Sequence, residues 1–149
     1  MTDTPQGRLV ALEGSYLTPS FEHARVADAM RTGLITCPPD TSMDSVARIM
    51  SSNHLHAVVV TGLAGGAPWG IVSDTDLLTV APDASDRLAG SCATEDPVMA
   101  KPSDRLADAV ELMRERGVTH LVVGDPGSDH PIGILSTLDV AGIVAWGRG

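Results

Sequence analysis

Two serine and aspartate pairs are the side chains of this sequence with the clearest capacity for chemistry. Ser73 and Asp76 lie three residues apart, and Ser136 and Asp139 repeat that spacing. At the start of a helix this spacing forms a capping box, in which the hydroxyl and the carboxylate each accept a backbone N–H. The same groups can instead hold a ligand, because a carboxylate accepts both hydroxyl groups of a ribose. The spacing therefore fits a structural role and a binding role.

The two pairs belong to a longer duplication. The segment Gly70–Asp76 reads GIVSDTD, and Gly133–Asp139 reads GILSTLD at an offset of 63 residues. The register continues upstream without a gap, for example from Met50 to Met113. A supersecondary unit that occurs twice is expected to bury the apolar faces of its copies against each other. Function is therefore expected at the seam between the copies.

Each copy is predicted to run strand, helix, strand, strand, helix. The strands are expected at residues 34–36, 57–60, 69–72, 97–99, 121–123 and 132–135. The helices are expected at residues 42–52, 74–80, 105–116 and 137–146, with Thr41 or Ser42 as the cap of the first and Gly117 as the end of the third.

The remaining segments lead into the copies or connect them. Residues 8–12 are expected to form a short strand or an ordered arm, and residues 21–30 have helical spacing. Residues 62–68 are a glycine-rich turn, and residues 86–89 a helical turn in the connector. The predicted organisation is a lead segment at 1–25, a first repeat at 26–81, a connector at 82–92 and a second repeat at 93–149.

The duplicated Gly-h-h-Ser-x-x-Asp motif and the element order resemble a tandem pair of CBS domains, the modules named after cystathionine β-synthase. The resemblance covers about residues 26–146. It implies an α/β (α+β) fold of two pseudo-twofold related β-α-β-β-α repeats, with adenosine-binding clefts between them. By this resemblance Ser73 and Asp76 serve one cleft, and Ser136 and Asp139 the other, with the acid on the ribose and the hydroxyl near the phosphate or ribose.

The resemblance also implies the walls of two adenine pockets. The first strands would line them, and the second strands would form the opposite walls. Family members often carry proline where this chain has Ala57 and His120, so His120 is expected to narrow the second cleft or add a polar contact. For a phosphate, Arg31 and Arg105 are the candidate cations, with solvated surface roles favoured for both. The further wall residues are Ile35, Thr36, Cys37, His56, Val98, Met99, Ala100 and Thr119.

Composition excludes several classes of function. The net charge of −9 and the pI of about 4.7 argue against nonspecific nucleic-acid binding, and 3% aromatic residues are too few for a base-stacking surface. No apolar run reaches the roughly eighteen residues of a membrane span, and the start of the chain lacks the pattern of a signal peptide, which predicts a cytoplasmic protein.

Metal and catalytic sites have little support in the sequence. His54 and His56 would point to one side of an extended segment, but no third ligand lies nearby in sequence. Cys37 and Cys92 are not equivalent in the two copies and are expected to be ordinary buried or half-buried residues. Nucleophile, phosphate-loop and zinc-protease motifs are absent from the sequence. The chain is therefore expected to be nonenzymatic and to need no cofactor.

The leading hypothesis is a regulatory sensor module that binds AMP, ATP or S-adenosylmethionine and responds through a partner protein. The apolar helix faces favour a homodimer. The alternative hypothesis is a structural or protein-interaction CBS module that binds no ligand, in which the serines and aspartates are helix caps only.

Overall fold

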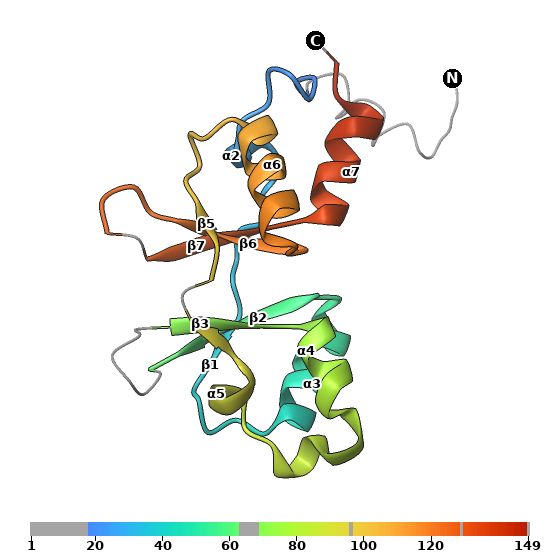
Figure 1. Cartoon of the computed structure of the whole chain (residues 1–149), viewed down its shortest axis with the longest axis vertical. Coiled ribbons are helices and arrows are strands. Elements are labelled where there is room, and N and C mark those ends of the chain that lie inside the picture. The colour runs from blue at the N-terminus through green and yellow to red at the C-terminus, as the bar shows by residue number, and fades with distance from the viewer. Residues whose placement is uncertain (1–17, 63–68, 96, 129, 149) are drawn as a thin grey trace. The chain divides into compact units, whose positions relative to one another are not determined.

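The computed structural model describes residues 18–62, 69–95, 97–128 and 130–148 (Figure 1). These residues form two compact units. One, here called the N-repeat unit, contains the described residues of Gly33–Pro97. The other, the C-repeat unit, combines residues 18–32 with the described residues from Val98 onward. Each unit holds one sheet with helices, as the predicted mixed α/β class requires.

The N-repeat unit is built on a sheet of strand order β1-β2-β3-β4. Strand β1 runs parallel to β2, whereas β2 with β3 and β3 with β4 are antiparallel. The strands are β1 (Thr36–Cys37), β2 (Ala57–Thr61), β3 (Trp69–Ser73) and β4 (Thr94–Glu95). The helices are α3 (Met43–Asn53), α4 (Asp74–Val80), the 3₁₀ helix η2 (Ala81–Asp86) and α5 (Ala89–Cys92).

Helix α3 shows how the local sequence sets these elements. Ser42 is its N-cap and accepts a hydrogen bond from the backbone N–H of Ser45. Met43, Val46 and Met50 recur on one face of the helix and are buried, as the helical period predicts. The helix ends at His54, which adopts the left-handed conformation with φ 54°.

The C-repeat unit repeats the plan with a sheet of order β5-β6-β7. Strand β5 runs parallel to β6, and β6 runs antiparallel to β7. The strands are β5 (Met99–Ala100), β6 (His120–Gly124) and β7 (Pro131–Ser136). The helices are α2 (Val26–Ala29), α6 (Leu106–Arg116) and α7 (Thr137–Trp146), and α6 ends at the predicted Gly117 with φ 64°.

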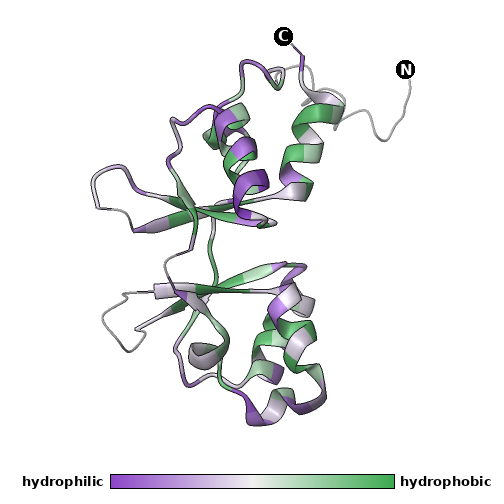
Figure 2. Cartoon of the chain, in the orientation of Figure 1, coloured by the Kyte–Doolittle hydropathy of each residue, from purple (hydrophilic) through white to green (hydrophobic). Residues whose placement is uncertain are grey.

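Each unit has its own hydrophobic core. Apolar residues concentrate along the central strands and on the inner sides of the helices, whereas α6 also carries hydrophilic residues (Figure 2). Valines of β2 and β6 are fully buried in both units, and Leu121 and Leu135 are fully buried in the C-repeat unit. No helix in the described part of the chain is long and apolar enough to cross a membrane.

Several predicted element boundaries were wrong. The first strands begin later than expected, at Thr36 and Met99 rather than residues 34 and 97. The helix expected at 21–30 is reduced to α2, because Arg25 and Met30 are extended and the N–H of Val26 bonds to the carbonyl of Asp104.

The connector also differs from its prediction. The helical turn expected at 86–89 is replaced by η2 and α5. Arg87 and Leu88 between them are extended, and Leu88 bridges to Ser42, so tertiary pairing overrides the local helical pattern. The expected strand or arm at 8–12 and the turn residues 63–68 lie outside the described residues.

Replacing Leu121 with alanine should destabilise the protein by about 2–5 kcal/mol, because the side chain is fully buried and the substitution leaves a cavity. Urea unfolding measures this loss. Leu138→Ala, in the same unit but 58% exposed, should change the free energy of unfolding by less than about 0.5 kcal/mol. Equal losses in the two variants would contradict the assigned core.

Candidate functional site

The first serine and aspartate pair lies where β3 runs into α4. Ser73 is the N-cap of α4, and its hydroxyl accepts the N–H of Asp76 at 3.4 Å. In return, Asp76 Oδ2 accepts the backbone N–H of Ser73 at 2.8 Å and its hydroxyl at 3.1 Å. The predicted capping box is therefore present, and it uses one of the two carboxylate oxygens.

The second pair forms the same box where β7 runs into α7. Asp139 Oδ2 accepts both the N–H and the hydroxyl of Ser136 at 2.9 Å. The Ser136 hydroxyl accepts the N–H of Asp139 at 3.3 Å. In both repeats the box thus holds the aspartate against the turn and leaves Oδ1 for another partner.

Arg31 is that partner in the C-repeat unit. Its Nε donates to Asp139 Oδ1 at 3.0 Å. The side chain of Asp139 is only 7% exposed, whereas that of Arg31 is 56% exposed. The ion pair therefore joins a shielded carboxylate to a guanidinium that still faces solvent.

Backbone pairing and a glycine bring Arg31 to this position. Arg31 and Ile134 exchange two backbone hydrogen bonds, at 2.9 and 3.0 Å, which fasten residue 31 beside β7. A Cβ atom on Gly133 would lie 2.8 Å from the carbonyl oxygen of Arg31, closer than side chains tolerate. The motif glycine thus has a packing role in this unit, since it lets the backbone of residue 31, which precedes β1, approach β7.

The equivalent position in the N-repeat unit carries no cation. Thr94 of β4 pairs with Ile71, just as Arg31 pairs with Ile134. Thr94 follows Arg31 by 63 residues, and Ile134 follows Ile71 by the same 63 residues. Among the residues that the structure describes, Asp76 has no ion-pair partner. The two boxes are the same, but their surroundings differ in charge.

A second difference lies at the first residue of each helix. Asp74 begins α4, and its Oδ2 lies within hydrogen-bonding distance of His56 Nδ1, at 2.8 Å. Its counterpart Thr137 begins α7 and carries no charge. In both units the N–H of this residue donates to the carbonyl of the residue just before the second strand. Asp74 donates to His56, and Thr137 donates to Thr119. The junction of the N-repeat unit therefore gathers two acids.

The second strands bring further predicted residues to the junctions. Ala57 is the register partner of Ser73, and His120 is the register partner of Ser136. Ala57 is buried, His120 is half-buried, and the His120 Nδ1 contacts the hydroxyl of Thr119 at 3.0 Å. The structure thus places Ala57 and His120 directly beside the motif serines.

The first strands lie one strand further from the junctions. Thr36 pairs with Val59 of β2, which in turn pairs with Ile71 of β3, and Met99 pairs in the same way with Val122 of β6. Thr36 is exposed, whereas Ile35, Val98 and Met99 are half-buried and Ala100 is buried.

Cys37 behaves as a core residue. Its side chain is 4% exposed, and burial raises the pKa of the thiol, while a hydrogen bond with Thr41 acts in the opposite, weaker direction. Cys37 is buried and Cys92 is half-buried, as predicted, and both are free thiols. No three His, Cys, Asp or Glu side chains in the described ranges are grouped to hold a metal ion.

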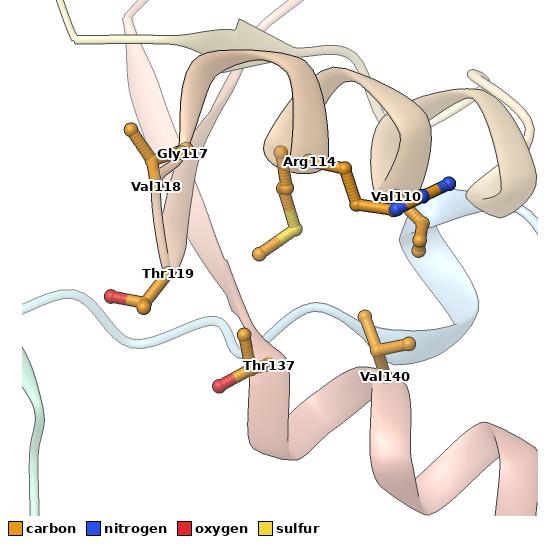
Figure 3. Close-up of a pocket in the computed structure, with 8 residues that line it drawn as sticks. Val110, Arg114, Gly117, Val118, Thr119, Thr137 and Val140 are labelled. Carbon is orange, nitrogen blue, oxygen red and sulfur yellow. The ribbon is translucent and has the colours of Figure 1, made fainter.

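A cavity that sequence reasoning did not anticipate lies in the C-repeat unit. Its volume is about 310 Å³, and Val110 of α6 and Val140 of α7 face each other across it (Figure 3). The hydroxyl groups of Thr119 and Thr137 lie at one end. Of the predicted site residues only Thr119 lines it, and the remaining lining residues are Met113, Arg114, Gly117 and Val118.

Comparison with protein families decides the identity of the repeats. The CBS domain model matches residues 26–83 and again residues 89–145. The chain belongs to the CBS domain family. It contains a pair of these domains, so the predicted family and fold are confirmed. A search of curated proteins found no match.

Solved structures of CBS proteins share this fold. CBSX2, solved in complex with AMP, is 26% identical, with a TM-score of 0.64 over 79% of this chain and 93% of that one. The CBS domain pair of MJ0100, solved with 5′-methylthioadenosine and S-adenosyl-L-methionine, is 16% identical, with a TM-score of 0.69 over 79% and 93%. A hexameric CBS-CP12 protein from bloom-forming cyanobacteria is 18% identical, with a TM-score of 0.71 over 78% and 69%.

Replacing Ser136 with alanine should cost about 1 kcal/mol of stability, because the N–H of Asp139 loses its acceptor and the carboxylate loses a donor. Urea unfolding measures the loss. The control is Thr137→Ala, which alters the adjacent exposed residue without touching the box. A Ser136→Ala variant as stable as the control would show that the box contributes nothing.

Proposed function

We propose that this CBS pair is a nonenzymatic regulatory module that binds an adenosine-containing ligand at the strand-to-helix junction of one or both repeats. The candidate ligands are AMP, ATP and S-adenosylmethionine. The observation that carries the proposal is that, in both repeats, the capping box bonds only one of the two carboxylate oxygens of the aspartate. At each junction the capping box fixes the aspartate through Oδ2, so that Oδ1 is held in place without being consumed by the box.

Each junction offers the groups that a nucleoside requires. The carboxylates of Asp76 and Asp139 would accept ribose hydroxyl groups, and the hydroxyls of Ser73 and Ser136 lie within the same turn for the ribose or phosphate. The complexes of CBSX2 with AMP and of MJ0100 with 5′-methylthioadenosine and S-adenosyl-L-methionine support this class of ligand. The adenine would contact the first and second strands, at Ile35, Thr36, Cys37, His56 and Ala57 in one repeat and Val98, Met99, Thr119 and His120 in the other.

The module would pass on ligand binding through an interface with a second copy or a regulated protein. Helix α7 supports a homodimer, because it exposes Leu138, Val144 and Trp146 to 58%, 66% and 52%. A ligand shifts such an assembly only by its difference in affinity for two arrangements of the protein.

One observation favours a second candidate function, a CBS pair that serves only as a structural or interaction module. Both capping boxes are complete without any ligand, so helix capping alone accounts for the serines and aspartates. Binding measurements separate the two functions.

Isothermal titration calorimetry with AMP, ATP and S-adenosylmethionine should show binding of at least one compound. Asp76→Asn or Asp139→Asn should weaken that binding by about tenfold or more, because the ribose loses a charged acceptor. Asparagine keeps an oxygen for the capping box, so the fold should be retained. The matched control is Asp108→Asn, at the third position of α6 outside any capping box.

The absence of heat with all three compounds would reject ligand binding in favour of the interaction module. Binding that is equally strong in the wild-type protein and in both junction variants would place the ligand elsewhere.

A further inference from the structure

We infer that the two junctions select ligands of different charge. The C-repeat junction accepts a phosphorylated adenosine, whose phosphate binds Arg31, and the N-repeat junction accepts an uncharged or cationic adenosine compound. Arg31 is then the residue that determines specificity. This inference rests on the proposed adenosine binding and goes beyond it by assigning a ligand class to each junction.

The contacts of Arg31 hold it in place to bind a phosphate. Its backbone is fastened to Ile134 by two hydrogen bonds, and its Nε is fixed on Asp139 at 3.0 Å. Within the described part of the chain, no hydrogen bond or ion pair involves its two terminal nitrogens, and more than half of the side chain is exposed. The N–H groups of the two terminal nitrogens are therefore left to donate to a phosphate. Because the backbone and Nε are already held, binding costs the side chain little conformational freedom.

The ion pair leaves Asp139 able to serve the ribose. A carboxylate has about four acceptor positions, two on each oxygen. The Ser136 N–H and hydroxyl occupy Oδ2, and Arg31 occupies one position on Oδ1. Phosphate and ribose groups are neighbours in a nucleotide, so adjacent Arg31 and Asp139 side chains match the order of those groups.

The N-repeat junction has the opposite electrostatic character. Thr94 replaces Arg31, and Asp74 replaces Thr137, so both differences make this junction more negative. Asp74 and Asp76 lie in the same first turn of α4. His56 contacts Asp74 and can offset part of that charge, but the carboxylate of Asp76 has no cation beside it among the described residues. A phosphate there would meet like charge well within the roughly 8 Å screening length.

The test measures each junction separately by calorimetry with adenosine, AMP and S-adenosylmethionine. The Asp76→Ala background leaves the C-repeat junction intact, and there AMP should bind about tenfold or more tightly than adenosine. Arg31→Gln in that background should lower the affinity for AMP about tenfold more than the affinity for adenosine, and so remove the preference for AMP. Arg31→Lys should keep part of the preference that Arg31→Gln removes, because lysine has the positive charge but lacks the paired N–H donors of the guanidinium.

The Asp139→Ala background leaves the N-repeat junction intact. There AMP should bind no more tightly than adenosine, and S-adenosylmethionine should bind at least as tightly as AMP. Thr94→Arg in this background should raise the affinity for AMP severalfold, because it places an arginine at the position equivalent to Arg31. The control is Arg105→Gln, since Arg105 donates to the carbonyl of Glu22 rather than to a junction.

The outcomes separate the inference from the proposed function. Adenosine binding that depends on Asp76 and Asp139, with no effect of Arg31→Gln on AMP, would overturn charge selection and leave the proposed function standing. An equal loss of adenosine and AMP in Arg31→Gln would assign Arg31 a structural role and also overturn it. If none of the compounds binds the wild-type protein, both the inference and the proposed function fail.

Discussion

The reciprocal hydrogen bonding between a serine and an aspartate at each strand-to-helix junction is the constraint on which the site depends. It ends the third strand, begins the following helix and fixes one carboxylate oxygen through Ser73 or Ser136. The other oxygen takes no part in the capping box, and in the C-repeat unit it accepts a hydrogen bond from Arg31. A single local motif thus satisfies the exposed N–H groups of a helix and orients a potential ligand acceptor, so the structural and binding roles do not exclude each other.

The duplication conserves this motif but surrounds it with different charges. At the third strand of each repeat, a segment from outside the β-α-β-β-α unit adds a further backbone pairing, through Arg31 in one unit and Thr94 in the other. Gly133 makes the close approach of Arg31 sterically feasible. Because only Arg31 brings a cation, one aspartate is neutralised and its counterpart is not. The two copies of the motif therefore lie in different electrostatic surroundings although the fold around them is the same.

Much of this arrangement could be predicted from the sequence. The 63-residue offset, the capping spacing and the helical period located both junctions and the helices α3 and α6, since these signals are local. The short α2 and the extended residues at Leu88 could not be predicted, because distant pairings with Asp104 and Ser42 determine them. Arg31 was a candidate cation, but its contact with Asp139, 108 residues away, depends on tertiary structure.

A crystal structure of the chain grown with AMP tests the central claim most directly. The account predicts that the ribose hydroxyl groups lie within hydrogen-bonding distance of the carboxylate of Asp76 or Asp139, while the serine of the same junction still caps its helix. A bound nucleotide that contacts neither carboxylate, with each aspartate bonded only as it is in the free protein, would contradict it.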